Sequence, residues 1–380
     1  MRKAWVAGLG DTPFGHIDGC DTLGLMSQAA QSALDDGGVE RAEIDGLVTG
    51  YSTAMPHLML ATLFAEHFGI TPEYCHAIQL GGATGAAALM LGKLLIEAGQ
   101  CQTVLIVAGE NRSSHSGGRE AAIRTLAQVG HASCEVPYGA TIPGYYALLA
   151  SHYLSEHGLK EEDLAELSVL MRRHAAEHHK AHFRQPIDVA DVMASKPIAT
   201  PLKLLDCCPI SDGGIAVVLT AEKDRSKRVR IAGAGQAHRH QHVSVADFSS
   251  FGATTAAGRA FRESGLDPAD VRVAGVYDSF TITLAILLEE IGFSRRGEAA
   301  RDAREGRFGR EGRLPLNTHG GLLSFGHSGV AGGMAHFVET VRQMAGEAEL
   351  RQIPSEPSVG FVHGDGGVLS SHVSLLLRHD

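Results

Sequence analysis

The chain has 380 residues, of which 44% are hydrophobic and 20% are charged, a composition that allows a globular chain to bury a large core. The formal net charge of −10 argues against a nucleic-acid surface, because phosphate binding needs a clustered excess of Lys and Arg. No apolar stretch reaches the ~18 residues of a membrane span, and the opening MRKAWVAGLG becomes glycine-rich before a signal-peptide core is complete. We therefore expect a cytoplasmic protein that binds neither nucleic acid nor membrane.

The chain opens with an expected strand, residues 6–10, that runs into glycines. One apolar helix face then recurs at helical spacing, formed by Ala29, Ala30, Ala33 and Leu34. Gly38 stands where a left-handed residue would end that helix. The glycines of the strand do not make a dinucleotide motif, because the third glycine of G-x-G-x-x-G would fall at Pro13. A nicotinamide cofactor is therefore not expected.

A glycine-rich turn over residues 81–85 directly precedes an expected helix, residues 86–98, and an apolar strand, residues 103–108. Such a turn exposes backbone N–H groups at the positive end of a helix, which suits an oxyanion. The alternative is that these glycines only allow the strand and the helix to pack closely.

Residues 111–201 carry two helical patterns, residues 140–157 and 161–183. We expect an inserted loop domain that closes over a ligand, because functional insertions sit above a rigid sheet scaffold. His174, His178 and His182 lie four residues apart, on one face of the second helix. That spacing can bind a metal, but the charged residues interleaved with the histidines favour a solvated surface.

The second part of the chain repeats the first. Residues 231–235 repeat residues 6–10 at an offset of 225, and Gly265 repeats Gly38 at an offset of 227. Strand and helix units that alternate in this way imply a mostly parallel sheet covered on both faces, here built twice. The predicted domains are residues 1–110 with 202–226, the inserted residues 111–201, and residues 227–380.

Several motifs together resemble the thiolase superfamily over the whole chain, most closely its bacterial sterol-carrier-type branch. Asn317-Thr318-His319-Gly320-Gly321 and Gly326-His327-Ser328-Gly329 resemble the family's N-x-x-G-G…G-H-P-x-G block, whose histidine polarises a thioester carbonyl. The other matching segments are residues 107–110, 211–214, 276–280 and 363–367. The resemblance implies an α/β fold with a duplicated five-layered αβαβα core and an inserted loop domain.

The chain departs from the family at the nucleophile. Gly82 stands at the position of the acylated cysteine, and Asp365 of the final glycine-rich loop is placed beside it at the oxyanion position. His363 stands at the second cysteine, which acts as a base in the family, and Tyr277 at the water-holding asparagine. A cysteine introduced at position 82 is therefore expected to become acylated.

Another cysteine could replace the missing nucleophile. Cys75 lies in an apolar strand, and Cys207 and Cys208 precede a glycine turn, so we expect these three to pack rather than react. Cys134 lies in a loop beside His131 and is the strongest of these alternatives. None of the six cysteines lies in a C-x-x-C pair, so no metal site is expected.

The resemblance implies a lipid-metabolism enzyme that makes or breaks the C–C bond next to the thioester of an acyl-CoA. It would be an acyltransferase by family or a retro-aldol lyase, working without an acyl-cysteine. Some relatives that lack the cysteine, the aldolases of steroid side-chain degradation, use tyrosines near these positions. We expect His327 and Asn317 to hydrogen-bond the thioester oxygen and Tyr277 and His363 to move protons. The alternative function is a non-catalytic acyl-CoA-binding or scaffold subunit.

The resemblance also implies the partners. A coenzyme A thioester is the expected substrate, and no covalently bound cofactor is expected. The family pairs sheet edges across a two-fold axis, so we expect a homodimer in which the apolar strand 103–108 presents such an edge. A small zinc-ribbon and oligonucleotide-fold protein is a further expected partner.

Overall fold

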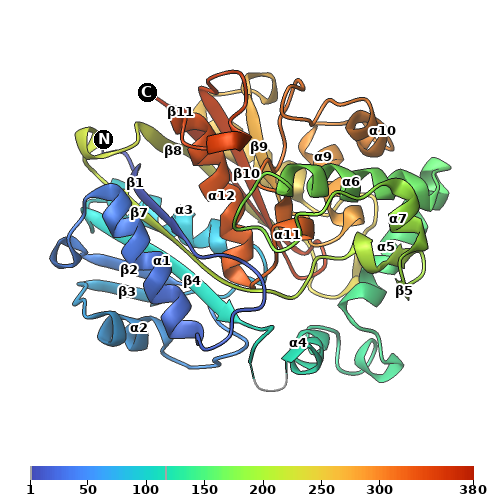
Figure 1. Cartoon of the computed structure of the whole chain (residues 1–380), viewed down its shortest axis with the longest axis horizontal. Coiled ribbons are helices and arrows are strands. Elements are labelled where there is room, and N and C mark those ends of the chain that lie inside the picture. The colour runs from blue at the N-terminus through green and yellow to red at the C-terminus, as the bar shows by residue number, and fades with distance from the viewer. Residues whose placement is uncertain (1, 116–117) are drawn as a thin grey trace.

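The computed structural model describes residues 2–115 and 118–380 (Figure 1). Its strands are β1 (Trp5–Asp11), β2 (Gly46–Thr49), β3 (Tyr74–Ala77), β4 (Thr103–Asn111), β5 (Pro197–Ala199), β6 (Leu202–Lys203), β7 (Asp212–Thr220), β8 (Val229–His238), β9 (Val273–Val276), β10 (Val359–Gly366) and β11 (Ser371–His379). Its helices are α1 (Thr22–Gly37), α2 (Leu60–Phe68), α3 (Thr84–Glu97), α4 (Gly118–Ala127), α5 (Ile142–His157), α6 (Glu161–Ala175), α7 (Val189–Ala194), α8 (Ala253–Ser264), α9 (Thr281–Ile291), α10 (Ala299–Arg304), α11 (Gly321–Ser324) and α12 (Val330–Ala345).

The strand order confirms the predicted duplication. The prediction of a mostly parallel sheet is wrong: five of the eight strand pairings are antiparallel, because β7 and β11 run against both of their neighbours and β1 runs against β8. One sheet runs in the order β3-β2-β4-β7-β1-β8-β11-β10-β9, and its two halves meet where Trp5 of β1 pairs with Arg230 of β8. The first half has the order β2-β4-β7-β1 and the second has β9-β10-β11-β8, so each strand has an equivalent in the other half. Even β3 has a counterpart, since Leu316 forms a parallel bridge to Ala274 of β9.

Glycines allow the first strand of each half to touch its helix. An ideal Cβ on Gly8 would lie 2.0 Å from the carbonyl oxygen of Ala33 in α1, and one on Gly233 would lie 2.3 Å from that of Ala260 in α8. Only a residue without a side chain permits such an approach. The repeated glycines of β1 and β8 therefore serve helix packing.

The predicted five layers are also confirmed. Helix α1 covers one face of the first half-sheet, and α8 covers the outer face of the second. Helices α3 and α12 contact each other and strands of both halves, and Figure 1 shows them in the middle of the molecule. The glycine-rich turns that begin these two central helices are thereby brought together.

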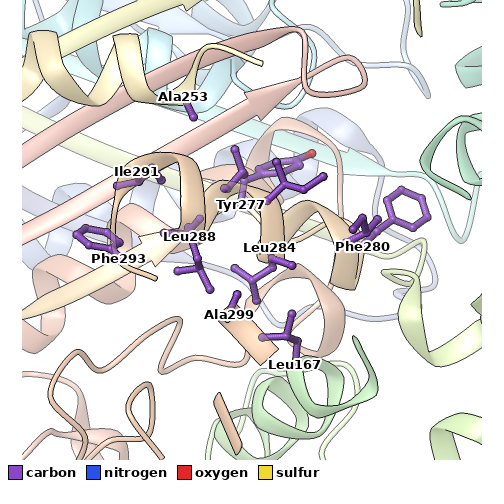
Figure 2. Close-up of a cluster of buried hydrophobic side chains, with 14 of the residues drawn as sticks. Leu167, Ala253, Tyr277, Phe280, Leu284, Leu288, Ile291, Phe293 and Ala299 are labelled. Carbon is purple, nitrogen blue, oxygen red and sulfur yellow. The ribbon is translucent and has the colours of Figure 1, made fainter. Parts of the chain in front are cut away.

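The inserted segment packs against the second half. Leu167 of α6 belongs to the same buried cluster as Leu284 and Leu288 of α9 (Figure 2). Helix α6 ends at Ala175, shorter than the predicted 161–183, because the chain beyond it pairs with another loop: the N–H of His182 donates to the carbonyl of Phe325 at 2.9 Å.

The predicted sheet edge is wrong. Strand β4, which contains residues 103–108, lies between β2 and β7. The edge of the first half is β3, which pairs only with β2 within the described sheet. Any pairing between two copies through the first half of this sheet must therefore use β3.

Within the described ranges, no helix combines the length and the apolar character that crossing a membrane requires. The same residues contain no cluster of three or more His, Cys, Asp or Glu side chains arranged to hold a metal ion.

The close packing of β8 on α8 predicts opposite effects for two glycines. Gly235→Ala should lower the thermal unfolding midpoint, because its Cβ would lie 2.1 Å from the Ala256 carbonyl oxygen, and overpacking costs roughly 1–3 kcal/mol or more. Gly258→Ala, on the exposed face of α8 with nothing within 4 Å of the new Cβ, should instead stabilise by about 1 kcal/mol. Equal midpoints for the two variants would contradict this packing.

Candidate active site

Position 82 lies where two glycine turns meet. Gly81 has φ +57°, and its Cβ would lie 2.8 Å from the backbone nitrogen of Gly367. Gly82 follows, immediately before α3, and it remains half-buried rather than enclosed. The turn that begins the first central helix thus packs backbone to backbone against the final glycine-rich loop.

The phenol of Tyr277 occupies the space that a side chain at position 82 would need. An ideal Cβ on Gly82 would lie 2.1 Å from the Tyr277 Oη and 2.4 Å from the Asp365 carbonyl oxygen. Tyr277 directly follows β9, and 5% of its surface is exposed. Figure 2 shows its ring among the side chains packed around α9. The phenol of Tyr277 can therefore occupy this position only because residue 82 has no side chain.

Tyr277 and His327 form a hydrogen bond, and a backbone contact of His327 determines which of the two side chains donates. The Tyr277 Oη lies 3.0 Å from the His327 Nε2. The backbone N–H of Gly329 donates to the His327 Nδ1 at 3.1 Å, which assigns the proton of a neutral imidazole to Nε2. The Nε2–H therefore donates to the tyrosine oxygen, and the hydroxyl hydrogen of Tyr277 is left to donate elsewhere.

Burial keeps both members of this pair uncharged. It lowers the pKa of His327 to about 3, and the positive charge of Arg112 adds to this effect. Burial also raises the pKa of Tyr277 well above its ordinary value, with the nearby Cys208 as the next cause. At neutral pH the pair is a neutral imidazole that donates to a neutral phenol.

Two acidic residues and a serine fix the loops around this pair. The Ser211 Oγ accepts the N–H of His327 at 3.2 Å. The Asp278 carboxylate accepts the N–H of Leu322 at 2.7 Å and so holds the start of α11. The Asp212 carboxylate accepts the N–H of Ser113 at 2.6 Å. Ser211, Asp212 and Asp278 therefore act by positioning backbone.

The amide of Asn317 is engaged by the backbone. Its Oδ1 accepts the N–H of Val276 and its Nδ2 donates to the carbonyl of Val276, both at 2.8 Å. The residue also has a left-handed backbone, with φ +47°. The expected hydrogen bond to a thioester oxygen would compete with both contacts, so Asn317 positions the end of β9 that carries Tyr277.

His363 and Asp365 point away from α3. On the opposite face of β10, the Cβ of Gly364 would lie 3.1 Å from that of Ala86 in α3, and side chains alternate along a strand. The His363 ring instead contacts the Ser374 Oγ at 2.8 Å and the His372 Nδ1 at 3.2 Å. Of the two, only Asp365 borders position 82, through its carbonyl oxygen.

The Asp365 carboxyl contacts the inserted segment. The hydroxyl of Tyr146 in α5 donates to its Oδ2 at 3.2 Å. The carboxyl is fully buried, and that burial raises its pKa well above the ordinary value. This contact links the inserted helices to the final glycine-rich loop.

The prediction of a solvated histidine face is wrong. His174 and His178 are 4% and 2% exposed, respectively, and burial lowers the pKa of His174 to about 4 and that of His178 to about 3. The His182 Nδ1 lies 2.9 Å from the Ser211 Oγ, the same hydroxyl that holds His327. Charged neighbours indicated a surface, but the histidines face inward under α11.

A buried ion pair that no motif in the sequence indicated lies at the end of β4. The Arg112 Nε lies 2.6 Å from the Glu110 Oε2, and the two side chains are 6% and 2% exposed. The sequence does place two opposite charges two residues apart at the end of an apolar strand, a pattern that could have indicated an ion pair. Their burial could not be foreseen from that pattern.

Two models of known protein families match this chain. A model described as the thiolase N-terminal domain matches residues 5–223, and one described as thiolase C-terminal domain-like matches residues 235–379. The chain belongs to the thiolase family. The two matched regions correspond to the two halves of the duplicated fold.

Similar thiolase-family proteins carry different activities in their names. An acetyl-CoA acetyltransferase of Methanothermobacter thermautotrophicus is 31% identical over 98% of this chain and 99% of its own length. A steroid side-chain-cleaving aldolase of Thermomonospora curvata is 33% identical over 89% of this chain and 90% of its own. A solved structure titled Ltp2-ChsH2(DUF35) aldolase superposes with a TM-score of 0.86 at 29% identity, covering 100% of this chain and 98% of the other.

The cysteines of this thiolase-family chain differ in their surroundings. Cys208 is near Tyr277, but burial raises its pKa well above the ordinary value, which disfavours the thiolate. Burial also raises the pKa of Cys75, on strand β3. Cys134 is exposed, and its backbone N–H donates to the His131 Nδ1 at 3.2 Å.

The steric conflict at position 82 changes the outcome expected for a cysteine placed there. Gly82→Cys alone should not be acylated, because its Cβ would fall 2.1 Å from the Tyr277 Oη. Removing the phenol leaves the Asp365 carbonyl oxygen 2.4 Å from the new Cβ, so the final glycine-rich loop must also shift. The double variant Gly82→Cys with Tyr277→Ala should then gain an acyl adduct, since the new thiol stands at the start of α3, where helix N-termini favour a thiolate. The measurement is intact-protein mass spectrometry after mixing with short and aromatic acyl-CoAs.

The thiol-free double variant Gly82→Ala with Tyr277→Ala is the matched control, and it should remain unmodified, like the natural chain. A reproducible adduct on Cys134, Cys75 or Cys207 of the natural chain would contradict this interpretation of the site.

Proposed function

We propose that this chain catalyses a reaction at the C–C bond beside the thioester of an acyl-CoA, without an acyl-cysteine intermediate. One observation carries the proposal: the Tyr277 hydroxyl, bonded to the His327 Nε2, fills the space beside Gly82. A thiolase cycle through a cysteine at this position would need that space for its sulfur.

In the proposed mechanism, Tyr277 is the donor to the thioester oxygen. The His327 Nε2–H donates to the phenol oxygen, which strengthens the donation of the phenol's own hydrogen, because consecutive hydrogen bonds polarise one another. An enolate forms when the adjacent C–C bond is broken, or before that bond is made, and its oxygen carries negative charge beside this donor. A buried, pre-oriented donor of this kind stabilises such a transition state by a few kcal/mol.

The direction we favour is retro-aldol cleavage of a β-hydroxyacyl-CoA. The bond between the α and β carbons breaks, its electron pair passes into the enolate, and the proton of the β-hydroxyl finally resides on the α carbon. The products are a carbonyl compound and a shorter acyl-CoA. Support comes from the similarity to the steroid side-chain-cleaving aldolase and from the Tyr277 phenol at the position of the missing thiol.

The quaternary structure is also a proposal. We propose a homodimer that forms through β3, the edge strand, and a small zinc-ribbon and oligonucleotide-fold partner. The partner is supported by the similarity to an aldolase whose title includes a DUF35 protein.

Tyr277→Phe and His327→Ala should each reduce turnover by roughly two to three orders of magnitude, the usual cost of one oxyanion donor. Tyr277→Phe should leave the affinity for acyl-CoA nearly unchanged, because it keeps the ring and removes the hydroxyl alone. The measurement pairs a retro-aldol assay with direct binding of CoA esters, with and without the co-expressed partner.

Tyr153→Phe is the control, since it removes a phenol that donates to Glu289 at 2.6 Å in a different part of the molecule. Wild-type rates in both site variants would place the chemistry elsewhere. Binding of CoA esters without turnover under any condition would favour the scaffold function, and full activity of the chain alone would remove the need for a partner.

The proposed dimer predicts a mass of about twice the 40.1 kDa of the chain in light scattering. Ala77→Pro should convert it to monomers. The N–H groups of Tyr74 and Ile78 point toward residues 45 and 49 on the β2 side, so by alternation that of Ala77 points to the open edge. Ala77→Ser keeps this N–H and should remain dimeric. A monomeric natural chain would rule out the assembly.

A further inference from the structure

The proposed reaction must move a proton to the α carbon of the acyl group, and no residue described so far does this. Tyr277 cannot supply that proton while it donates to the thioester oxygen. His363 was expected to move protons, but its ring contacts the Ser374 Oγ and the His372 Nδ1 and points away from α3. The proton transfer at the α carbon therefore needs another group near Tyr277.

The duplication gives Tyr277 a counterpart in the first half. Tyr51 follows β2 as Tyr277 follows β9, and the two tyrosines are 226 residues apart, between the offsets of 225 and 227 that relate the two halves. Strands β2 and β9 are equivalent, because each pairs in parallel with the longer strand beside it, β2 with β4 and β9 with β10. A second phenol thus stands at the equivalent strand end.

Packing brings this second phenol to the candidate active site. An ideal Cβ on Gly50 would lie 2.7 Å from a methyl group of Val330, the first residue of α12, and the turn before α12 carries His327. Tyr51 is half-buried and packs against the same hydrophobic cluster as Val330. Burial is the main cause that raises the pKa of Tyr277, and the nearby Tyr51 is among the further causes.

An arginine orients the hydroxyl of Tyr51. Burial raises the pKa of Tyr51, and the charge and a hydrogen bond of Arg112 oppose that rise. A guanidinium can only donate, so the Tyr51 oxygen accepts and its own hydrogen is left for another acceptor. Among residues 2–115 and 118–380, none accepts that hydrogen. The Glu110 carboxylate holds Arg112 at 2.6 Å and accepts the N–H of Ala54 at 2.9 Å, which fixes the arginine to the turn after Tyr51.

Two other side chains near Tyr277 are less suited to the transfer. Tyr146 is 1% exposed, and its hydroxyl already donates to the Asp365 Oδ2 and the Gly367 carbonyl, both at 3.2 Å. Burial raises the pKa of Cys208 well above its ordinary value, which disfavours a thiolate. Of these three groups, Tyr51 alone combines an unengaged hydrogen with a cation bonded to its oxygen.

We propose that Tyr51 is the catalytic residue that transfers the proton at the α carbon. The inference rests on the proposed function, because it assumes that the thioester lies at Tyr277. The electron pair of the enolate forms a C–H bond to the hydrogen of Tyr51, and the phenolate left behind takes the proton that the β-hydroxyl releases. Tyr51 ends as a phenol, so no further acid or base is consumed, and the hydrogen bond from Arg112 stabilises the phenolate in between.

The test follows the exchange of the α hydrogens of propionyl-CoA in D2O, which breaks no C–C bond and needs no second substrate. At about pH 9, where a fraction of phenol groups is ionised, the natural chain should replace one of the two α hydrogens, because a single positioned group reaches one side of the α carbon. Tyr51→Phe should lower the exchange rate by about two orders of magnitude or more, the usual contribution of a general acid or base. The affinity for propionyl-CoA should stay nearly unchanged, since the ring remains.

Mass spectrometry of the recovered thioester counts the deuterium, with and without the co-expressed partner. Tyr153→Phe is the control and should exchange at the natural rate, because its hydroxyl donates to Glu289 in another part of the molecule. Exchange of both α hydrogens by the natural chain, or no exchange at all, would overturn the inference even if Tyr51→Phe does not fold. A natural rate in Tyr51→Phe would overturn it too, and a loss of exchange in Cys208→Ala instead would assign the transfer to that thiol.

Cleavage of 3-hydroxyacyl-CoAs, measured separately, distinguishes this inference from the proposed function. Exchange that depends on Tyr51 in a chain that cleaves none of them supports the proton transfer and contradicts the proposed function. Cleavage that Tyr51→Phe leaves at the natural rate does the reverse.

Discussion

The hydrogen bond between Tyr277 and His327, at the point where residue 82 has no side chain, is the constraint on which the rest of the site depends. The phenol and a Cβ at position 82 cannot coexist at 2.1 Å, so the position of Tyr277 requires a glycine there, and the Asp365 carbonyl oxygen, 2.4 Å from that Cβ, requires it as well. The direction of the bond depends on a third element, the Gly329 N–H that fixes the imidazole tautomer. Because burial keeps both groups neutral, the pair can act as a chain of donors and not as an ion pair.

The duplicated fold explains why such distant residues meet. Gly82 comes from the first half, and Tyr277 and His327 come from the second. Helices α3 and α12 lie between the half-sheets and contact each other, so the turns that begin them converge on one place. The equivalent strands β2 and β9 end near it as well, β2 in the turn that Glu110 holds and β9 in Tyr277. The duplication places equivalent strand and helix ends around the site. The residues at those ends differ between the two halves, and these differing residues form the site.

Several residues of the recognisable motifs hold backbone in place rather than face the site. Asn317 binds Val276 through both of its amide atoms, Asp278 holds the start of α11, and Ser211 holds His327. A carboxylate or amide that accepts or donates backbone hydrogen bonds fixes a loop at a small cost, because the loop groups would otherwise be buried without partners. The precision of the Tyr277 and His327 contact rests on these supports.

The sequence by itself determined the duplication and those helix ends that a glycine marks, and it singled out Gly82, Tyr277 and His327, which the structure brings together. Glycines at equivalent places and alanines at helical spacing are local patterns, and local chemistry sets where helices begin and end, as at Gly38 with φ +57°. The tertiary structure alone decided which strand is an edge, that His174 and His178 are buried, that His363 turns away from α3, and that Arg112 lies beside His327. Whether a side chain is buried, and which way it points, depends on contacts between segments far apart in the chain. The residue pattern of a single segment carries no information about those contacts.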